Sequence, residues 1–314
     1  MERNISPKFG SSLPVPCVQE LAKESPEIII PTRYVREDLE PLPLAVKQIP
    51  VINMANLLKG KSELRSLRRW ILQAKNGVFF SFEKTLDRFL LQLINHGVSS
   101  SLVEKVKTET KHFYLPMEEK KKFWQKPGDL QGFGSAFVHS EDQKLDWCDL
   151  FYIITLPTYL RKPDLFPNLP LPFRETVEMY AEELRNLAMT LTDYLAKALG
   201  IEQEHIRGLF NEGLQAMRMN HYPRCPQPDK ILSNGTYHSA EHRAVVNSKE
   251  ERLSIATFFN PRLDAELGPA PTLITPQNPA KFRTVGVEDY FKGLFAGRLE
   301  RKAYIEVMRI QNGR

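Results

Sequence analysis

Apolar residues recur at two different spacings along this chain, and the spacing separates predicted helices from predicted strands. The longest helical pattern covers residues 173–199, where apolar side chains return every three or four positions and Gly200 supplies the stop. Shorter helices are predicted over 18–23 and 99–111, and another one opens at Pro116. The pattern therefore predicts one long structural helix with several short helices before it.

Short runs rich in β-branched and aromatic residues predict the strands. They cover 49–53, a stretch that begins at Val78, the run LLQLI, 146–155, 214–223 and 252–259. Residues 62–75 have helical composition, 126–135 predict a glycine-bearing loop, and 155–172 predict an irregular, proline-rich connection. Helical and strand segments thus both occur along the chain.

Composition narrows the classes of function. The chain has 314 residues, 42% of them hydrophobic and 26% charged, and a net charge of +5 that is spread widely. The densest basic cluster directly follows two glutamates in a predicted helix, which indicates a solvated face and no nucleic-acid partner. Three distant cysteines provide neither a zinc motif nor a disulfide framework. With no signal peptide and no run of transmembrane length, we expect a cytoplasmic monomer without a membrane partner.

Arg252 and Ser254 are two residues apart in the last predicted strand, so their side chains share one face. On an inward face this pair would need an anion, and a carboxylate suits a guanidinium fork beside a hydroxyl. On an edge strand the same pair would be ordinary surface residues. Both interpretations stay open at this point.

Seven histidines are candidate metal ligands. A hydrogen-bonded turn role is expected for His96, and a strand-end position is expected for His221. His112 and His205 are expected at incidental positions on helix surfaces. His139 and Glu141 form the one His-x-acid pair in the chain, a spacing that can serve a metal. His238 and His242 are four apart, about 13 Å along a strand, so at most one of them binds a given ion. We favour His242. The absence of G-x-S-x-G, P-loop and CxxC motifs argues against hydrolase, NTPase and thiol-redox chemistry.

Several motifs in combination resemble the plant iron(II)/2-oxoglutarate-dependent dioxygenases. They are LQLINHGV, DLQGFGSAFV, LDWCDLFYI, MRMNHYPRCPQPD, EHRAVVNS and ERLSIATF. The resemblance points to the group that contains senescence-related proteins, flavonol and anthocyanidin synthases and alkaloid O-demethylases. It implies an α+β fold, a double-stranded β-helix (jelly roll) carried by an N-terminal helical region. We expect the helical region to cover 1–125 and the jelly roll to cover 126–314.

The resemblance also assigns roles to individual residues. His242 matches the distal histidine that holds iron, and Arg252 with Ser254 matches the pair that binds the far carboxylate of 2-oxoglutarate. Asn220 and Tyr222 match a pair that also approaches this cosubstrate. The implied cofactors are Fe(II) and 2-oxoglutarate, with O₂ as co-reactant and ascorbate as a further reductant. The implied reaction is decarboxylation of 2-oxoglutarate coupled to hydroxylation, desaturation or demethylation of a small specialised metabolite.

The chain departs from the family pattern at two places. Lys230 runs directly into ILSNGTYHSAEHR, so the family's His-x-Asp iron ligands and several strands are absent, and we expect an incomplete jelly roll. In addition, SFEKTLDRFL separates GVFF from LQLINHG, two stretches that the family joins directly. Three interpretations follow: an impaired oxidoreductase, a catalytically inactive relative with a binding role, or a rewired metal site that uses His139 and Glu141 beside His242.

Overall fold

The fold is described by a computed structural model, which defines most of the chain outside the first ninety residues. The described residues are 12–24, 30–35, 51–57, 65, 92–114, 117–126, 129–135, 138, 140–225, 248–296 and 308–310. The expectations for 62–75 (apart from residue 65), for the strand beginning at Val78, and for the stretch that precedes residue 248 and holds His238 and His242 concern residues outside this set.

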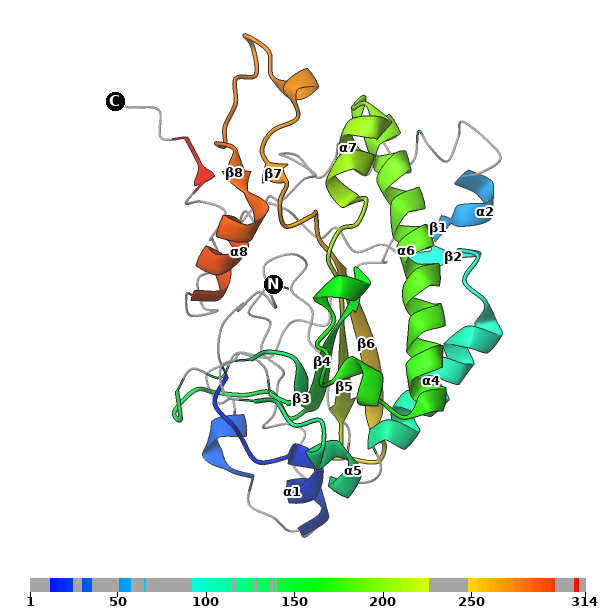
Figure 1. Cartoon of the computed structure of the whole chain (residues 1–314), viewed down its shortest axis with the longest axis vertical. Coiled ribbons are helices and arrows are strands. Elements are labelled where there is room, and N and C mark those ends of the chain that lie inside the picture. The colour runs from blue at the N-terminus through cyan, green and yellow to red at the C-terminus, as the bar shows by residue number, and fades with distance from the viewer. Residues whose placement is uncertain are drawn as a thin grey trace.

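The described residues form both helices and strands (Figure 1). The helices are α1 (Val18–Glu24), α2 (Met54–Leu57), α4 (Ser100–Tyr114), α5 (Met117–Lys121), α6 (Leu171–Leu199), α7 (Gln203–Phe210) and α8 (Val287–Ala296). The strands are β1 (Val51–Asn53), β2 (Gln92–Ile94), β3 (Gly132–Gly134), β4 (Asp149–Leu156), β5 (Gln215–Tyr222), β6 (Arg252–Phe259), β7 (Glu266–Leu267) and β8 (Val285–Gly286). Short 3-10 helices lie at Thr32–Tyr34, Thr158–Leu160, Phe166–Asn168 and Pro271–Leu273.

The long predicted helix is confirmed as α6, and both of its ends follow from the sequence. Pro170 forms the N-cap and a second proline follows in the first turn, where a missing N–H costs nothing. Gly200 ends the helix at a φ of 71°, and its N–H bonds to the carbonyls of Ala196 and Lys197. The predicted helices over 18–23 and 99–111 and at Pro116 are confirmed as α1, α4 and α5.

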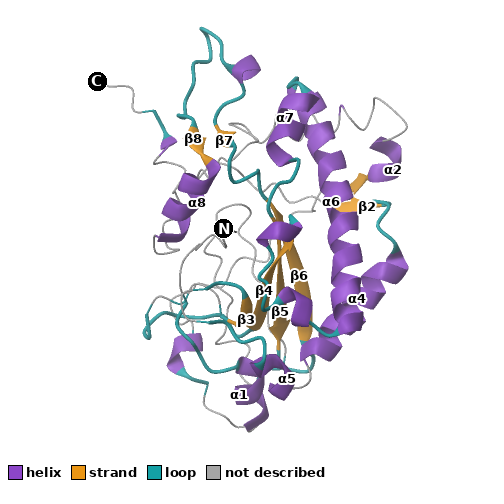
Figure 2. Ribbon diagram, in the orientation of Figure 1, coloured by secondary structure: helices purple, strands orange, loops and turns teal. Residues whose placement is uncertain are grey.

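Four strands form an antiparallel sheet in the order β3-β4-β5-β6, which lies beside α4 and α6 in Figure 2. The predicted strands over 146–155, 214–223 and 252–259 are confirmed as β4, β5 and β6. The shorter predictions at 49–53 and LLQLI correspond to β1 and β2, which pair in parallel. The strands β7 and β8 pair separately.

One prediction is wrong within the described residues: the glycine-bearing loop over 126–135 contains β3. Phe133 pairs with Phe151 of β4, and Gly132 takes a φ of 127°, which side-chain-bearing residues rarely adopt. A Cβ on Gly132 would lie 2.8 Å from the Phe123 carbonyl oxygen. The glycine that suggested a loop is thus required because another backbone passes close to this strand.

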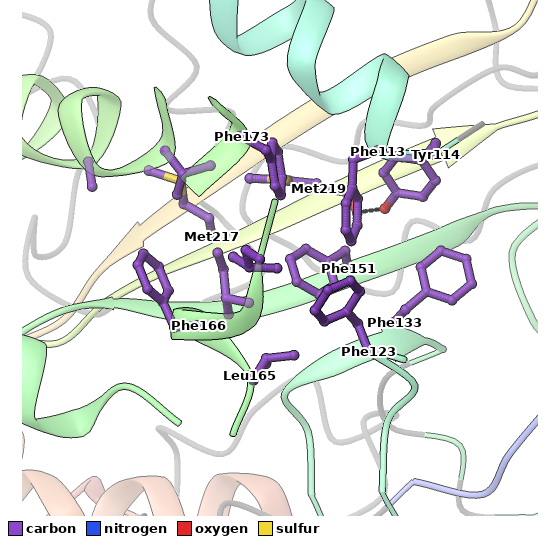
Figure 3. Close-up of a cluster of buried hydrophobic side chains, with 14 of the residues drawn as sticks. Phe113, Tyr114, Phe123, Phe133, Phe151, Leu165, Phe166, Phe173, Met217 and Met219 are labelled. Carbon is purple, nitrogen blue, oxygen red and sulfur yellow. Dashed lines mark hydrogen bonds between the residues drawn. The ribbon is translucent and has the colours of Figure 1, made fainter. Parts of the chain in front are cut away.

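The main core fills the space between the sheet and the helices α4 and α6 (Figure 3). Phe113 of α4 stacks on Phe173 of α6 with ring centroids 4.6 Å apart. Tyr114 donates a 2.8 Å hydrogen bond to the carbonyl of Met219, which ties α4 to β5. Met217 and Met219 are fully buried, so one face of β5 is committed to packing.

The opposite face of the sheet packs differently at each end. Near one end, Ile154 and Ala216 join a cluster with Val287 and Tyr290 around α8. At the other end, Tyr222 joins a cluster with Val18 and Tyr34 of the N-terminal segments. Asp149, on the core face of β4, holds α1 there by accepting hydrogen bonds from the backbone N–H groups of Val18 and Gln19. Between these ends, polar side chains occupy the sheet face. Within the described residues, no helix has both the length and the apolar character needed to cross a membrane.

Candidate functional site

The strands β5 and β6 bring four of the five residues expected at the site together. In their antiparallel register Asn220 faces Ser254 and Tyr222 faces Arg252. The intervening residues Leu253 and Ile255 pack against the main core, as do Met217 and Met219. Because side chains alternate along a strand, the four polar residues share the face that is turned away from α4 and α6.

Hydrogen bonds connect these side chains across the two strands. The Asn220 Nδ2 donates to Ser254 Oγ at 3.2 Å, and the Tyr222 side chain is hydrogen-bonded to Ser254. The Arg252 guanidinium lies over the Tyr222 ring, 5.2 Å from its centroid, a cation–π contact. The two strands therefore present a connected cluster, which we call the polar cradle: Asn220, Tyr222, Arg252 and Ser254.

The four residues of the polar cradle are buried to different degrees. Asn220 is 5% exposed and Tyr222 is 9% exposed, Ser254 is half-buried and Arg252 is exposed. Burial raises the pKa of Tyr222, so its hydroxyl is protonated and able to donate at neutral pH. No ion pair joins Arg252 to a carboxylate in the described part of the chain. The cradle thus combines a rigid, buried base with a cationic group that solvent can reach.

This donor set has the chemistry to bind a carboxylate. A guanidinium can grip a carboxylate in two places, and the neighbouring Ser254 and Tyr222 add hydroxyl donors. The exposure of Arg252 is also what an ordinary edge-strand arginine would show, but its register neighbour is a buried tyrosine with a polar partner. The connected network favours the binding interpretation over two unrelated surface residues.

The described residues contain no complete set of iron ligands. They contain no group of three histidine, cysteine or acidic side chains that could hold a metal ion. His242 and His139 lie outside the described residues, and Glu141 is exposed. The arrangement of His139 and Glu141 beside His242 therefore stays a prediction, and so does the role of His242.

The described histidines lie in a turn, on two helix surfaces and at a strand end, as the sequence predicts. The Nδ1 of His96 accepts from the backbone N–H of Val98 at 3.2 Å within its turn, and His112 and His205 are exposed on α4 and α7. His221 at the end of β5 is 4% exposed and its Nε2 lies 3.2 Å from Glu251 Oε2. The side chain of His221 lies on the core face, away from the polar cradle.

Reasoning from the sequence missed one member of this face, Arg218. It lies two residues before Asn220 on β5, and its Nε donates to Asn220 Oδ1 at 2.7 Å. Its neighbour across the sheet is Tyr152 of β4, whose pKa burial raises to about 12. The alternation of polar and apolar residues in MRMNHY was the signal that could have identified Arg218.

Family models match two parts of the chain. The N-terminal model of the non-haem dioxygenases in morphine synthesis matches residues 89–169, and the 2OG-Fe(II) oxygenase superfamily model matches 230–261. The second match includes His242 and the Arg252–Ser254 stretch.

The similarity to known proteins covers nearly the whole chain. Oxoglutarate-dependent flavonoid 7-O-demethylase 1 of Ocimum basilicum is 41% identical over 365 residues, which covers 98% of this chain and 94% of that protein. Protein SRG1 of Arabidopsis thaliana is 41% identical (96% and 98% covered), and codeine O-demethylase of Papaver somniferum is 37% identical (99% and 100% covered).

A solved structure shares the fold. JOX2, crystallised in complex with 2OG, Fe and JA, superimposes with a TM-score of 0.75 over 95% of this chain and 98% of its own, at 22% identity. At this identity the likeness shows the fold alone, and it supports the α+β, jelly-roll class. Together with the identity to the Ocimum, Arabidopsis and Papaver proteins, these matches show that the chain belongs to the plant 2-oxoglutarate- and Fe(II)-dependent dioxygenase family.

Proposed function

We propose that this chain is an Fe(II)- and 2-oxoglutarate-dependent oxidoreductase that hydroxylates, desaturates or demethylates a small plant specialised metabolite. The observation that carries the proposal is the polar cradle, a connected set of donors with an accessible arginine on the face of the sheet opposite the core. O-demethylases among its relatives support a small organic substrate.

Each residue of the cradle has a separate task in this proposal. Arg252 pairs with the distal carboxylate of 2-oxoglutarate, while Ser254 and Tyr222 donate hydrogen bonds to the same end of the molecule. Asn220 holds Ser254 in place. His242 is the proposed iron ligand. When bound, iron and 2-oxoglutarate together supply the oxidising chemistry.

The proposed rate is low, because the chain offers few iron ligands. Non-haem iron oxygenases hold the metal with two histidines and one carboxylate, which leaves positions for other ligands. In this chain the one His-x-acid pair is His139 and Glu141, and it lies far along the sequence from the stretch that matches the oxygenase model. One imidazole gives iron little affinity, so we expect turnover only with added Fe(II).

Release of succinate from 2-oxoglutarate tests this proposal. The full chain is incubated aerobically with Fe(II), ascorbate and 2-oxoglutarate, with and without an O-methylated flavonoid. We expect slow, iron-dependent succinate formation that Arg252→Gln abolishes. The matched control is Arg262→Gln, because Arg262 is an exposed arginine paired with Asp264. No succinate at any iron concentration would refute the catalytic proposal.

A second candidate is an inactive family member that binds 2-oxoglutarate without turnover. The specific observation behind it is length: the match to the Ocimum relative runs over 365 positions, whereas this chain has 314 residues, so the relative carries residues opposite gaps in this chain. The chain also lacks a His-x-Asp pair. For this candidate we expect the protein to bind 2-oxoglutarate without forming succinate. The intact mass of the native protein should be that of the 314-residue chain, 36.2 kDa.

We also propose that the protein is a cytoplasmic monomer, divided into a helical region over 1–125 and a jelly roll over 126–314. Three buried cysteines, Cys17, Cys148 and Cys225, form no disulfide with one another, which supports a reducing compartment.

A further inference from the structure

Arg218 extends the polar cradle by one residue and makes a contact that no other residue of the cradle makes. Its Nε donates to Asn220 Oδ1 at 2.7 Å, and Asn220 Nδ2 in turn donates to Ser254 Oγ at 3.2 Å. Asn220 is 5% exposed, so both ends of its amide depend on protein partners. The three side chains form an ordered chain of hydrogen bonds across β5 and β6.

The chemistry of the guanidinium sets the direction of these hydrogen bonds. Arginine has donors and no acceptor, so the oxygen of the Asn220 amide must face it and the amide nitrogen must face Ser254. The Ser254 oxygen therefore accepts, and its own proton stays available for another group. The neighbouring acceptors are the Tyr222 oxygen, to which Ser254 is hydrogen-bonded, and a bound carboxylate.

We propose that Arg218 is a positioning residue: by fixing the orientation of the Asn220 amide, it keeps the Ser254 proton turned away from Asn220, toward Tyr222 and the carboxylate that the cradle binds. The inference rests on the proposed function, since it concerns the same 2-oxoglutarate site. Without Arg218 the amide can turn over. Its oxygen would then accept the Ser254 proton, and the ligand would lose that donor.

Two neutral substitutions of Arg218, similar in shape, distinguish its positioning of Asn220 from a direct attraction between its charge and the bound anion. In Arg218→Gln the amide nitrogen stands at the same position along the side chain as the arginine Nε, so the donor to Asn220 is retained and the charge is lost. In Arg218→Met a methyl group occupies that position, so both are lost. If Arg218 acts on the anion through its charge, the two variants must lose affinity equally.

Affinity for 2-oxoglutarate is measured by anaerobic equilibrium dialysis of the full chain with Fe(II). We expect Arg218→Gln to stay within about twofold of the unmodified chain and Arg218→Met to bind about tenfold more weakly, the effect of one lost hydrogen bond in a charged site. Arg262→Met serves as the control for removing a remote arginine. Equal weakening of the Gln and Met variants would overturn the proposal.

A ligand-free measurement keeps this test separate from the proposed function. In protein labelled with ¹⁵N-asparagine, the Asn220 side-chain amide is identified by its loss in Asn220→Asp, and its hydrogen exchange is followed. We expect slow exchange in the unmodified chain and Arg218→Gln, and exchange at least about tenfold faster in Arg218→Met. Equal exchange in both variants overturns the positioning role, whereas an unmodified chain that binds no 2-oxoglutarate but shows the expected exchange overturns only the proposed function.

Discussion

At the scale of single residues, β5 shows how one strand serves two purposes. Met217 and Met219 fill the core beside α4 and α6, while Asn220 and Tyr222 belong to the polar cradle on the opposite face. The sequence and its family resemblance predicted the members of the cradle, because their spacing is local. Arg218 was not predicted, because its hydrogen bond to the Asn220 amide becomes evident only in the folded strand.

Protonation of His221 in β5 makes the stability of the protein depend on pH. Burial lowers its pKa from the ordinary value of 6.5, and the nearby Glu251 opposes this effect only in part. The unfolded chain therefore takes up a proton more readily than the folded protein, so this contribution to stability is complete above pH 6.5 and is lost as the pH falls through the folded pKa. Glu251, whose pKa Lys111 and His221 lower, acts in the same direction below pH 4.5.

We expect the free energy of unfolding, measured with urea, to fall between pH 7 and pH 5.5. In His221→Gln, which has no titrating ring, the slope over this range should be smaller. His205→Gln is the matched control, because His205 is an exposed histidine on α7. An unchanged slope in His221→Gln would show that another group carries the acid sensitivity.

At the scale of elements, local sequence patterns predicted the long helix and strands but not the short strand β3. The helix α6 and the strands β4, β5 and β6 each contain enough periodic residues to identify them. The three-residue strand β3 has two glycines, and it exists because it pairs with β4 and because its backbone passes close to Phe123. Neither contact leaves a local trace in the sequence, so the glycines predicted a loop.

Gly132→Ala tests this explanation of β3. The added Cβ would meet the Phe123 backbone at 2.8 Å and would sit at an unfavourable φ. We expect a loss of about 1–3 kcal/mol in the free energy of unfolding, the usual cost of a strained backbone position.

Gly208→Ala is the matched control, because a Cβ at Gly208 in α7 meets no atom within 4 Å. This change should stabilise the protein by about 0.5–1 kcal/mol through helix propensity. Similar effects of the two substitutions would contradict the close approach at β3.

At the scale of the whole molecule, the family fold could be predicted from the sequence, and so could the placing of Asn220, Tyr222, Arg252 and Ser254 on one face of β5 and β6. The jelly roll followed from motifs that recur across the family, and the similarity to JOX2 supports it. The residues around His242 lie outside the described set, and the sequence offers no His-x-Asp pair to place there.

Insertion of a segment between Lys230 and Ile231 tests whether missing ligands limit this chain. The insert is the stretch of the Ocimum relative that we expect to follow its counterpart of Lys230, where the family resemblance places the His-x-Asp that this sequence lacks. We expect iron-dependent succinate formation to rise by at least about a hundredfold, because three protein ligands replace one. An insert whose histidines are changed to alanine controls for restored folding; an equal rise with both inserts would contradict the explanation.

The central claim is that Arg252, with Ser254 and Tyr222, recognises the distal carboxylate of 2-oxoglutarate. The most direct test compares anaerobic binding of 2-oxoglutarate and 2-oxopentanoate, which carries a methyl group in place of that carboxylate. The unmodified chain should bind 2-oxoglutarate at least about tenfold more tightly, and Arg252→Gln should remove this preference while Arg262→Gln keeps it. Equal binding of the two acids, or a preference that survives in Arg252→Gln, would contradict the claim.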